Sequence, residues 1–307
     1  MITAPLSRDH LARSVMAVPP LARAADGTIS ETENGRIIRH LEAGGVELLL
    51  YGGNANLYHL PLGEYDDLLA LLTRLAGPRT LVVPSAGPTY GLLLEHARIV
   101  RRHSFPTVMV LPQQGITTSR GVAEGVRRFV DAAGVPALLY VKHDGFIEPE
   151  DVAALDREGL ISAIKYATVR SDPAADPSLR RLVGVVDPGK IISGIGEQPA
   201  IIHLRDFGLG GFTSGCVCVA PRLSQALLAA VRRGDFPAAE RIRDVFSPLE
   251  DLRNAINPIR VLHQAVASAG IAATGPLLPL LSTVEAADVP PIAAAATALL
   301  AADKLSG

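Results

Sequence analysis

Hydrophobic residues along the chain gather in short runs that are separated by longer amphipathic segments. Most of the short runs are almost continuous in Val, Ile and Leu rather than alternating with polar residues. Such runs are typical of strands in a parallel sheet that is covered on both faces. The expected strands are residues 14–18, 47–51, 80–84, 107–111, 137–141, 162–166, 190–193 and 211–217.

The longer segments between these strands have helical spacing. In residues 65–76, for example, the leucines fall on one stripe of a helix. Eight alternating units favour a closed (β/α)8 TIM barrel over an open doubly wound sheet. No G-x-G-x-x-G turn opens a first helix, which argues against a dinucleotide-binding fold. The expected helices include residues 34–43, 65–76, 90–103, 119–133, 148–158 and 197–207.

After Pro221 the pattern changes to helices alone, expected at 224–233, 237–246, 249–268 and 290–302. One of them is expected to close the barrel as its eighth helix. We therefore predict a barrel over residues 1–225 and a C-terminal helical region over residues 226–307 that includes the closing helix.

Composition narrows the classes of function. The 307 residues are 48% hydrophobic and carry a formal net charge of −2, so a nucleic-acid or anionic-membrane partner is not expected. The run 292–302 is too short to span a membrane, and the start lacks the apolar stretch of a signal peptide. Cys216 and Cys218 are expected as buried thiols on one face of a strand, with no metal site. The sequence predicts a soluble cytoplasmic protein without a cofactor.

Lys165 is the residue that most clearly indicates chemistry. It stands inside the apolar run 160–166, although lysine is rarely buried unless it is paired or has a task. Desolvation would lower its pKa, and a free amine beside a cavity can attack a ketone to form an iminium. A lysine that points into solvent, or one in a structural ion pair, would explain the same pattern.

Tyr140 ends the preceding strand, and neighbouring strands lie about 5 Å apart. Its phenol is therefore a candidate proton relay for Lys165, although an aromatic ring that only fills the barrel is the alternative. Other polar residues at strand ends are candidates for binding a ligand, or for shaping ordinary turns. These substrate-binding candidates are Gly52, Gly53, Asn54, Asn56, Gln113, Lys142, His143, Thr213 and Ser214.

The order of these motifs resembles the dihydrodipicolinate synthase and N-acetylneuraminate lyase family over nearly the whole chain. The resemblance rests on the glycine-rich turn 52–56, Tyr140, the Ile164-Lys165 pair, the segment 26–30 and the segment 210–215. It implies a class I lyase in which Lys165 forms a Schiff base with pyruvate or a related 2-oxo acid and Tyr140 relays protons. It also implies that the turn 52–56 binds the 2-oxo carboxylate, and that the protein is a homotetramer or homodimer.

The sequence departs from the family pattern at several of these positions. Gly53 and Asn54 stand where the family has two hydroxyl residues, Asn56 replaces its acidic residue, and Gln113-Gln114 replace a tyrosine pair. We therefore expect a divergent aldolase or 2-keto-3-deoxy sugar acid dehydratase rather than a true dihydrodipicolinate synthase. The alternative is a catalytically altered barrel that binds a 2-oxo acid or a sugar phosphate as a ligand.

Overall fold

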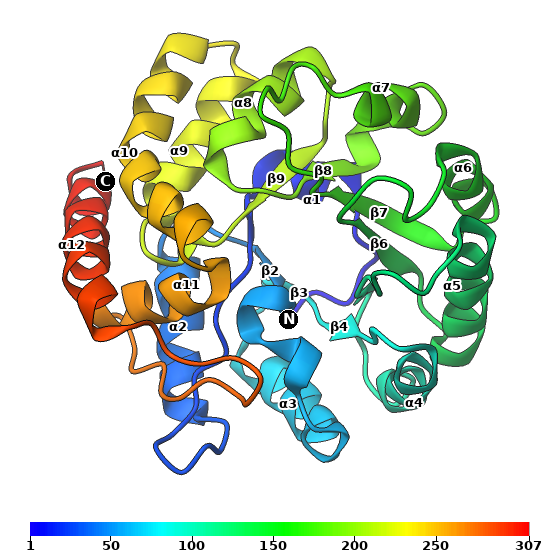
Figure 1. Ribbon diagram of the computed structural model, residues 1–307, viewed down its shortest axis with the longest axis horizontal. Coiled ribbons are helices and arrows are strands. Elements are labelled where there is room, and N and C mark those ends of the chain that lie inside the picture. Colours follow the sequence, from blue (N-terminus) through cyan, green and yellow to red (C-terminus); the bar gives the residue numbers. More distant parts are fainter. Residues whose placement is uncertain (307) are drawn as a thin grey trace.

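Nine parallel strands form one sheet that closes into a barrel (Figure 1). The computed structural model describes residues 1–306. The strand order is β3-β2-β1-β9-β8-β7-β6-β5-β4, and every pair is parallel. The strands are β1 Met16–Ala17, β2 Leu48–Leu50, β3 Leu81–Val83, β4 Ser85–Ala86, β5 Val108–Val110, β6 Ala137–Val141, β7 Ile161–Tyr166, β8 Ile191–Ser193 and β9 Gly211–Ser214.

The ninth strand arises because the strand expected at 80–84 continues past Pro84, which divides the longer strand into β3 and β4. The Tyr51 N–H donates to the Val83 carbonyl oxygen (3.0 Å), and the Met109 N–H donates to the Pro84 carbonyl oxygen (2.8 Å). Proline cannot donate a hydrogen bond to a neighbouring strand, so the ladder changes partner at this position. The divided strand pairs with β2 on one side and β5 on the other, and it thereby closes the barrel.

Helices surround the sheet because each buries one apolar stripe against it. In α5 the buried residues Ala123, Val126, Phe129 and Ala133 recur at helical spacing, and Gly134 ends the helix with a φ of 73°. The surrounding helices are α2 Glu31–Ala43, α3 Leu62–Leu75, α4 Tyr90–Val100, α5 Ser119–Ala133, α6 Pro149–Arg157, α7 Pro177–Val183, α8 Glu197–Asp206 and α9 Pro221–Arg232; α1 is Arg8–Arg13.

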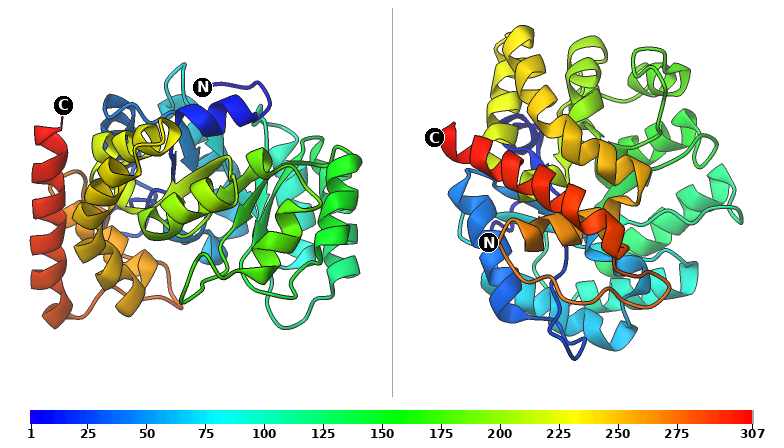
Figure 2. Two further views of the ribbon diagram at one scale, coloured as in Figure 1. Left: turned by 90° about the horizontal axis from the view of Figure 1, so that it is seen from above. Right: turned by 60° about the vertical axis from the view of Figure 1, so that its left-hand side comes forward.

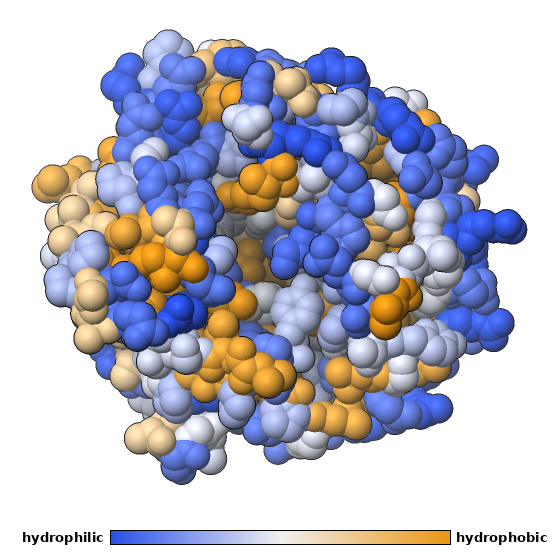
Figure 3. Space-filling model, viewed as in Figure 1, coloured by the Kyte–Doolittle hydropathy of each residue, from blue (hydrophilic) through white to orange (hydrophobic). Residues whose placement is uncertain are grey.

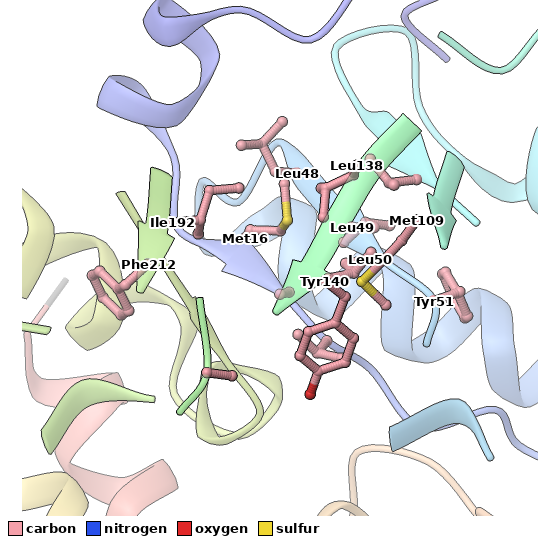
Figure 4. Packing of buried hydrophobic residues seen from close by; sticks show 14 of the residues in the cluster. Met16, Leu48, Leu49, Leu50, Tyr51, Met109, Leu138, Tyr140, Ile192 and Phe212 are labelled. Atoms are coloured by element: carbon pink, nitrogen blue, oxygen red, sulfur yellow. The ribbon is translucent and has the colours of Figure 1, made fainter. Parts of the chain in front are cut away.

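The interior of the barrel is filled by side chains. Met16, Leu48, Leu138 and Ile192 come from four different strands and are completely buried, and Figure 4 shows them gathered between the strands. A filled barrel is a packed core and not a channel. A ligand site can therefore lie only at an end of the barrel or outside it.

The C-terminal helices correct two predicted bounds. The expected helices 237–246 and 249–268 are instead α10 Phe236–Ala255, which continues through Pro248, and α11 Pro258–Ser268. The helix is interrupted before Pro258 because the Asn257 carboxamide accepts from the backbone N–H groups of Ile259 (3.0 Å) and Arg260 (3.1 Å). A side-chain cap followed by proline starts a new helix, whereas an internal proline removes only one helical hydrogen bond.

The last helix, α12 Val289–Leu305, lies on the outside of the C-terminal region, away from the barrel (Figure 2). It buries Ile292, Ala296 and Leu299 and packs against α10 and α11. The stretch Ala286–Leu305, with a mean hydropathy of 1.2, is the one segment within residues 1–306 that is long and apolar enough to cross a membrane. Core helices of soluble proteins meet the same test, so this is weak evidence for a membrane span.

The two cysteines are buried free thiols, as expected, but they do not lie on a strand. The expected strand 211–217 ends at Ser214, and Cys216–Cys218 form a 3-10 turn. The strand stops because the Ser214 hydroxyl accepts from the Val217 N–H (2.9 Å) and the Gly215 carbonyl oxygen accepts from the Cys218 N–H (3.0 Å). The prediction that both thiols share one strand face was therefore wrong.

Candidate active site

A cavity of about 310 Å³ opens at the carboxyl ends of the strands. Figure 3 shows this face of the molecule, which is hollowed near its centre. Its walls come from the loops after β2, β6, β7, β8 and β9, together with the junction of α10 and α11. Two larger hollows, of about 590 and 610 Å³, do not contact Lys165. The smaller cavity is therefore the candidate site, because it contains the reactive groups.

Lys165 lies inside β7 and reaches this cavity with its amine. The residue is 5% exposed, and its strand partner in β6 is Tyr140. The Lys165 Nζ atom lies 4.5 Å from the centre of the Tyr140 ring, and no ion pair joins it to a carboxylate in the part of the chain that the structure describes. Burial, reinforced by the positive charges of Lys142 and Arg253, lowers the pKa of Lys165 from 10.5 to about 7. A large fraction of the amine is therefore uncharged near neutral pH.

Gly194 allows the side chain of Lys165 to pack closely against the backbone after β8, because a Cβ atom at this position would have no room. A Cβ atom at Gly194 would lie 2.7 Å from the Tyr166 carbonyl oxygen, 2.7 Å from the Ala167 Cβ and 3.0 Å from the Lys165 Cγ. A backbone oxygen at that distance cannot move aside without shifting β7. The absence of a side chain at Gly194 therefore fixes where the amine points.

We expect Gly194→Ala to slow imine formation at Lys165 by about tenfold or more, because small displacements of a reacting group are costly. The rate of borohydride-trapped adduct formation with a 2-oxo acid measures the effect. Gly63→Ala is the matched control, since a Cβ at Gly63 meets no atom within 4 Å. Equal rates for the two variants would show that Gly194 does not position the lysine.

Tyr140 presents its hydroxyl group to the cavity. Figure 4 shows the Tyr140 oxygen pointing away from the packed side chains of the barrel interior. Burial raises the pKa of Tyr140 to about 12, so the phenol stays protonated at neutral pH. A protonated phenol beside an uncharged amine can donate a proton to an oxygen that leaves the carbon attached to Lys165.

The turn after β2 is held by side chains from elsewhere in the fold. The Asn54 carboxamide donates to the Val18 carbonyl oxygen (2.9 Å), and His263 Nε2 donates to the Asn54 carbonyl oxygen (2.9 Å). Burial lowers the pKa of His263 to about 4, so the imidazole is neutral. Asn56 adopts a left-handed conformation with a φ of 55°. These contacts fix the turn with the residues Gly53 and Asn54 against the cavity.

The structure brings together six of the eleven residues that the sequence indicated. Lys142 adds a second amine from the loop after β6, and Thr213 lies near the end of β9. The remaining Asn54 and Gly53 come from the turn after β2. The cavity is lined by Gly53, Asn54, Tyr140, Lys142, Lys165 and Thr213 from the predicted set.

The other five predicted residues do not line this cavity. Gln113 lies in a separate hollow with Ile116, and His143 lines a small pocket beside α6. The Ser214 hydroxyl donates to Glu197 (2.8 Å) behind the cavity wall. The carboxamide of Asn56 is buried, and the structure gives it no hydrogen-bond partner within residues 1–306. Gly52 packs beneath the turn, where a Cβ atom would lie 2.7 Å from the Met109 Cε.

Tyr58 and Arg253 are among the cavity residues that were not predicted from the sequence. Tyr58 follows the turn after β2, and burial together with the nearby Tyr140 raises its pKa. Lys142 Nζ lies 5.9 Å from the centre of the Tyr58 ring. Tyr58 stands close in sequence to the turn 52–56, and this was a signal that could have identified it. Arg253 comes from the last turn of α10, and its sequence context is that of an ordinary helix.

The amino end of α8, beside the cavity, is already occupied by a carboxylate. Glu250 from α10 accepts from the backbone N–H groups of Glu197 (2.9 Å) and Gln198 (3.0 Å). Desolvation raises the pKa of both Glu197 and Glu250, and the charge of Glu197 raises the pKa of Glu250 further. Because Glu250 fills the place that a phosphate would take at this helix end, the loop 194–196 does not fit a sugar-phosphate site.

Comparison with known proteins finds relatives of moderate similarity over most of the chain. No family model matches the sequence. The chain is 24% identical over 255 residues to the probable 5-dehydro-4-deoxyglucarate dehydratase 2 of Streptomyces coelicolor, which covers 81% of this chain and 77% of that one. It is 31% identical over 179 residues to the 4-hydroxy-tetrahydrodipicolinate synthase of Pseudomonas aeruginosa, with 56% and 58% covered.

Solved structures show the same fold over almost the full length. The dihydrodipicolinate synthase from Bacillus clausii superposes with a TM-score of 0.83 at 24% identity, covering 97% of this chain and 99% of that one. The sialic acid aldolase of Ruminococcus gnavus gives 0.83 at 14% identity, covering 95% and 99%. The relatives are thus a dehydratase, a synthase and an aldolase on one barrel. The chain shares the barrel fold of these proteins and is similar in sequence to a dehydratase and a synthase.

Proposed function

We propose that the protein is a Schiff-base lyase for a 2-oxo acid, and that its substrate is a 2-keto-3-deoxy sugar acid that it dehydrates or cleaves. The observation that carries the proposal is Lys165, a buried amine without an ion pair whose pKa is lowered to about 7 beside the Tyr140 phenol. The similarity to 5-dehydro-4-deoxyglucarate dehydratases favours dehydration.

The proposed reaction begins when the substrate carboxylate binds at the turn that carries Gly53 and Asn54. The Lys165 amine then adds to the C2 carbonyl, and Tyr140 donates a proton to the departing oxygen as water leaves. The resulting iminium accepts the electron pair that remains when a proton is lost from C3. In a dehydration, the enamine so formed expels the hydroxyl group at C4 as water.

Borohydride trapping tests the proposal directly. The protein is incubated with pyruvate or a longer 2-oxo acid, reduced, and analysed by intact mass and peptide mapping. We expect a stable adduct on the peptide that contains Lys165. If a folded sample gives no adduct with any 2-oxo acid, the Schiff-base function is wrong.

The pH dependence of trapping follows from the lowered pKa of Lys165. Only the uncharged amine attacks a carbonyl, so the initial rate should rise with pH and level off above a midpoint near 7. Lys142→Gln removes a positive charge that disfavours the ammonium form of Lys165, so its midpoint should move to higher pH. A midpoint near 10 in the unaltered protein would mean that the amine is solvated and not activated.

A ligand-binding protein without turnover is the second candidate. The observation that favours it is the Asn54 carboxamide, which replaces a hydroxyl group and is already committed to Val18. An amide cannot pass on a proton as a hydroxyl group does. This candidate predicts binding of a 2-oxo acid, measured by calorimetry, without exchange of its C3 protons in deuterium oxide. Exchange of those protons would favour the lyase.

Two further expectations belong to the proposal. We propose a cytoplasmic location and a homotetrameric or homodimeric assembly, for which the support is the resemblance of the whole chain to the family. Gln113, Ile116 and Tyr90 line an exposed groove outside the active cavity, and Ile116 is 81% exposed. Light scattering coupled to size exclusion measures the assembly.

A further inference from the structure

The geometry points to Arg253 as the residue that binds a second negatively charged group of the substrate. The preferred substrate is then a 2-oxo acid with a second carboxylate at the far end of its carbon chain. This inference rests on the proposed function, because it concerns the ligand of the same cavity. It adds a substrate class and a specificity-determining residue that lies outside the barrel strands.

Arg253 is buried, yet it reaches the cavity. It is 9% exposed and lines the same hollow as Lys165. The guanidinium group approaches β9 closely because Gly215 has no side chain; a Cβ atom there would lie 2.6 Å from the Arg253 Nη2. Arg253 is also close enough to Lys165 for its positive charge to contribute to the lowered pKa of that amine. The charge of Arg253 is therefore directed to the reacting end of the barrel.

The positive charge of Arg253 is not paired with a carboxylate within residues 1–306, although two carboxyl groups lie nearby. Both oxygens of Glu250 accept backbone N–H groups of α8. Both oxygens of Glu197 accept hydroxyl groups, from Ser214 (2.8 Å) and Ser224 (2.7 Å). These two side chains are thus committed to other donors. The guanidinium group remains available to a ligand.

The contacts that Arg253 does make leave one nitrogen unused. Nε donates to the Pro258 carbonyl oxygen (3.4 Å), and Nη1 lies 3.9 Å from the Cys216 sulfur. Burial raises the pKa of the Cys216 thiol, so the sulfur is neutral. Nη2 has no hydrogen-bond partner among the residues that the structure describes. Glu250 and Glu197 lie near enough to raise the pKa of Arg253, and a carboxylate bound at Nη2 would add a direct hydrogen bond to this charge.

The charge of the cavity as a whole agrees with a substrate of two negative charges. Lys142, Lys165 and Arg253 line it, and no Asp or Glu does so among residues 1–306. Lys165 reacts with the substrate carbonyl and so cannot bind a carboxylate. The carboxylate next to that carbonyl is proposed to bind at the turn after β2. Arg253 lies beside the end of β9, which β1 separates from β2, and its planar guanidinium group matches the geometry of a carboxylate. A second carboxylate is the group that would use it.

Two six-carbon 2-oxo acids test the inference, because 2-oxoadipate carries a distal carboxylate and 2-oxohexanoate does not. Borohydride trapping is measured against concentration at a pH well above 7, where Lys165 is uncharged in every variant. We expect half-maximal trapping at a concentration about tenfold or more lower for 2-oxoadipate. Arg253→Gln should abolish most of this difference by raising the 2-oxoadipate value.

Arg241→Gln is the matched control, because Arg241 is exposed on the same helix and should leave the preference intact. If Arg253→Gln does not fold, as judged by thermal unfolding, Arg253→Lys takes its place. Lysine keeps the positive charge but lacks the planar guanidinium group that can bind a carboxylate through two hydrogen bonds. Arg253→Lys should therefore weaken trapping of 2-oxoadipate several-fold more than trapping of 2-oxohexanoate. An unaltered preference in the variant that folds would overturn the assignment.

The outcomes separate this inference from the proposed function. If the unaltered protein traps pyruvate but does not prefer 2-oxoadipate, the inference falls and the Schiff-base function stands. If the preference exists but Lys142→Gln abolishes it while Arg253→Gln does not, the second carboxylate binds at Lys142 and Arg253 is not the determinant. If no 2-oxo acid is trapped, both proposals are wrong.

Discussion

Lys165→Ala is expected to abolish the trapped adduct and to lower turnover of the natural substrate by at least about a thousandfold, because the variant lacks the amine that is proposed to form the iminium. The fold should survive, since removing a buried amine without an ion pair leaves no charge unpaired. The measurements are intact mass after reduction and steady-state kinetics. The same variant should still bind a 2-oxo acid weakly through the turn after β2.

Lys304→Ala is the control for this variant, because Lys304 is an exposed residue in the last turn of α12. It should trap pyruvate as the unaltered protein does. If Lys165→Ala retains an adduct, peptide mapping identifies the amine that carries it, and Lys142 is the other lysine that lines the cavity. An adduct on Lys142 would contradict the mechanism proposed for Lys165.

Tyr140→Phe is expected to slow adduct formation by on the order of a hundredfold while leaving the final extent of trapping unchanged, because general acid–base catalysis contributes at that level. Phenylalanine keeps the ring that packs against Lys165 Nζ and removes only the hydroxyl group. Rapid-quench reduction separates the rate from the extent.

Tyr166→Phe is the matched control for Tyr140→Phe. The Tyr166 hydroxyl donates to Asp176 (2.8 Å) and does not line the active cavity. The rate with this variant should stay within about twofold of the unaltered rate, since the change lies outside the reacting groups. A rate for Tyr140→Phe that is equally unaffected would mean that the Tyr140 ring only fills the barrel.

The barrel could be predicted from the sequence because local signals and the fold agree. The expected strand 137–141 and helix 119–133 have the same bounds in the structure, where a continuous apolar run and a Thr118 cap specify them. The pairing of Tyr140 with Lys165 followed from the adjacency of consecutive strands, and the register confirms it. Consecutive strands of the barrel lie next to each other, so residues at their ends are close in space. This part of the site could therefore be predicted without information on long-range contacts.

The other side of the cavity depends on contacts that no local pattern reveals. Arg253 lies in the sequence among residues of an amphipathic helix, where an arginine is normally solvated. It reaches the cavity from the last turn of α10, which ends at Ala255 shortly before the unexpected break at Asn257. The expected helices broke between residues 246 and 249 rather than at Asn257, so Arg253 was placed in the helix 249–268 instead of α10. Gln113 and His143 line other pockets instead of this cavity.

The carboxylate of Glu250 links the barrel and the C-terminal helices into one cooperative unit. It satisfies two backbone N–H groups of α8, and Gly196 adopts a φ of 97° where a Cβ atom would collide with the Glu250 Oε1. If α10 unfolds, those two amides lose their acceptor and the wall of the cavity loosens at the same moment. Local opening of the C-terminal helices is therefore coupled to loss of the binding site, and the two regions should exchange their amide hydrogens together.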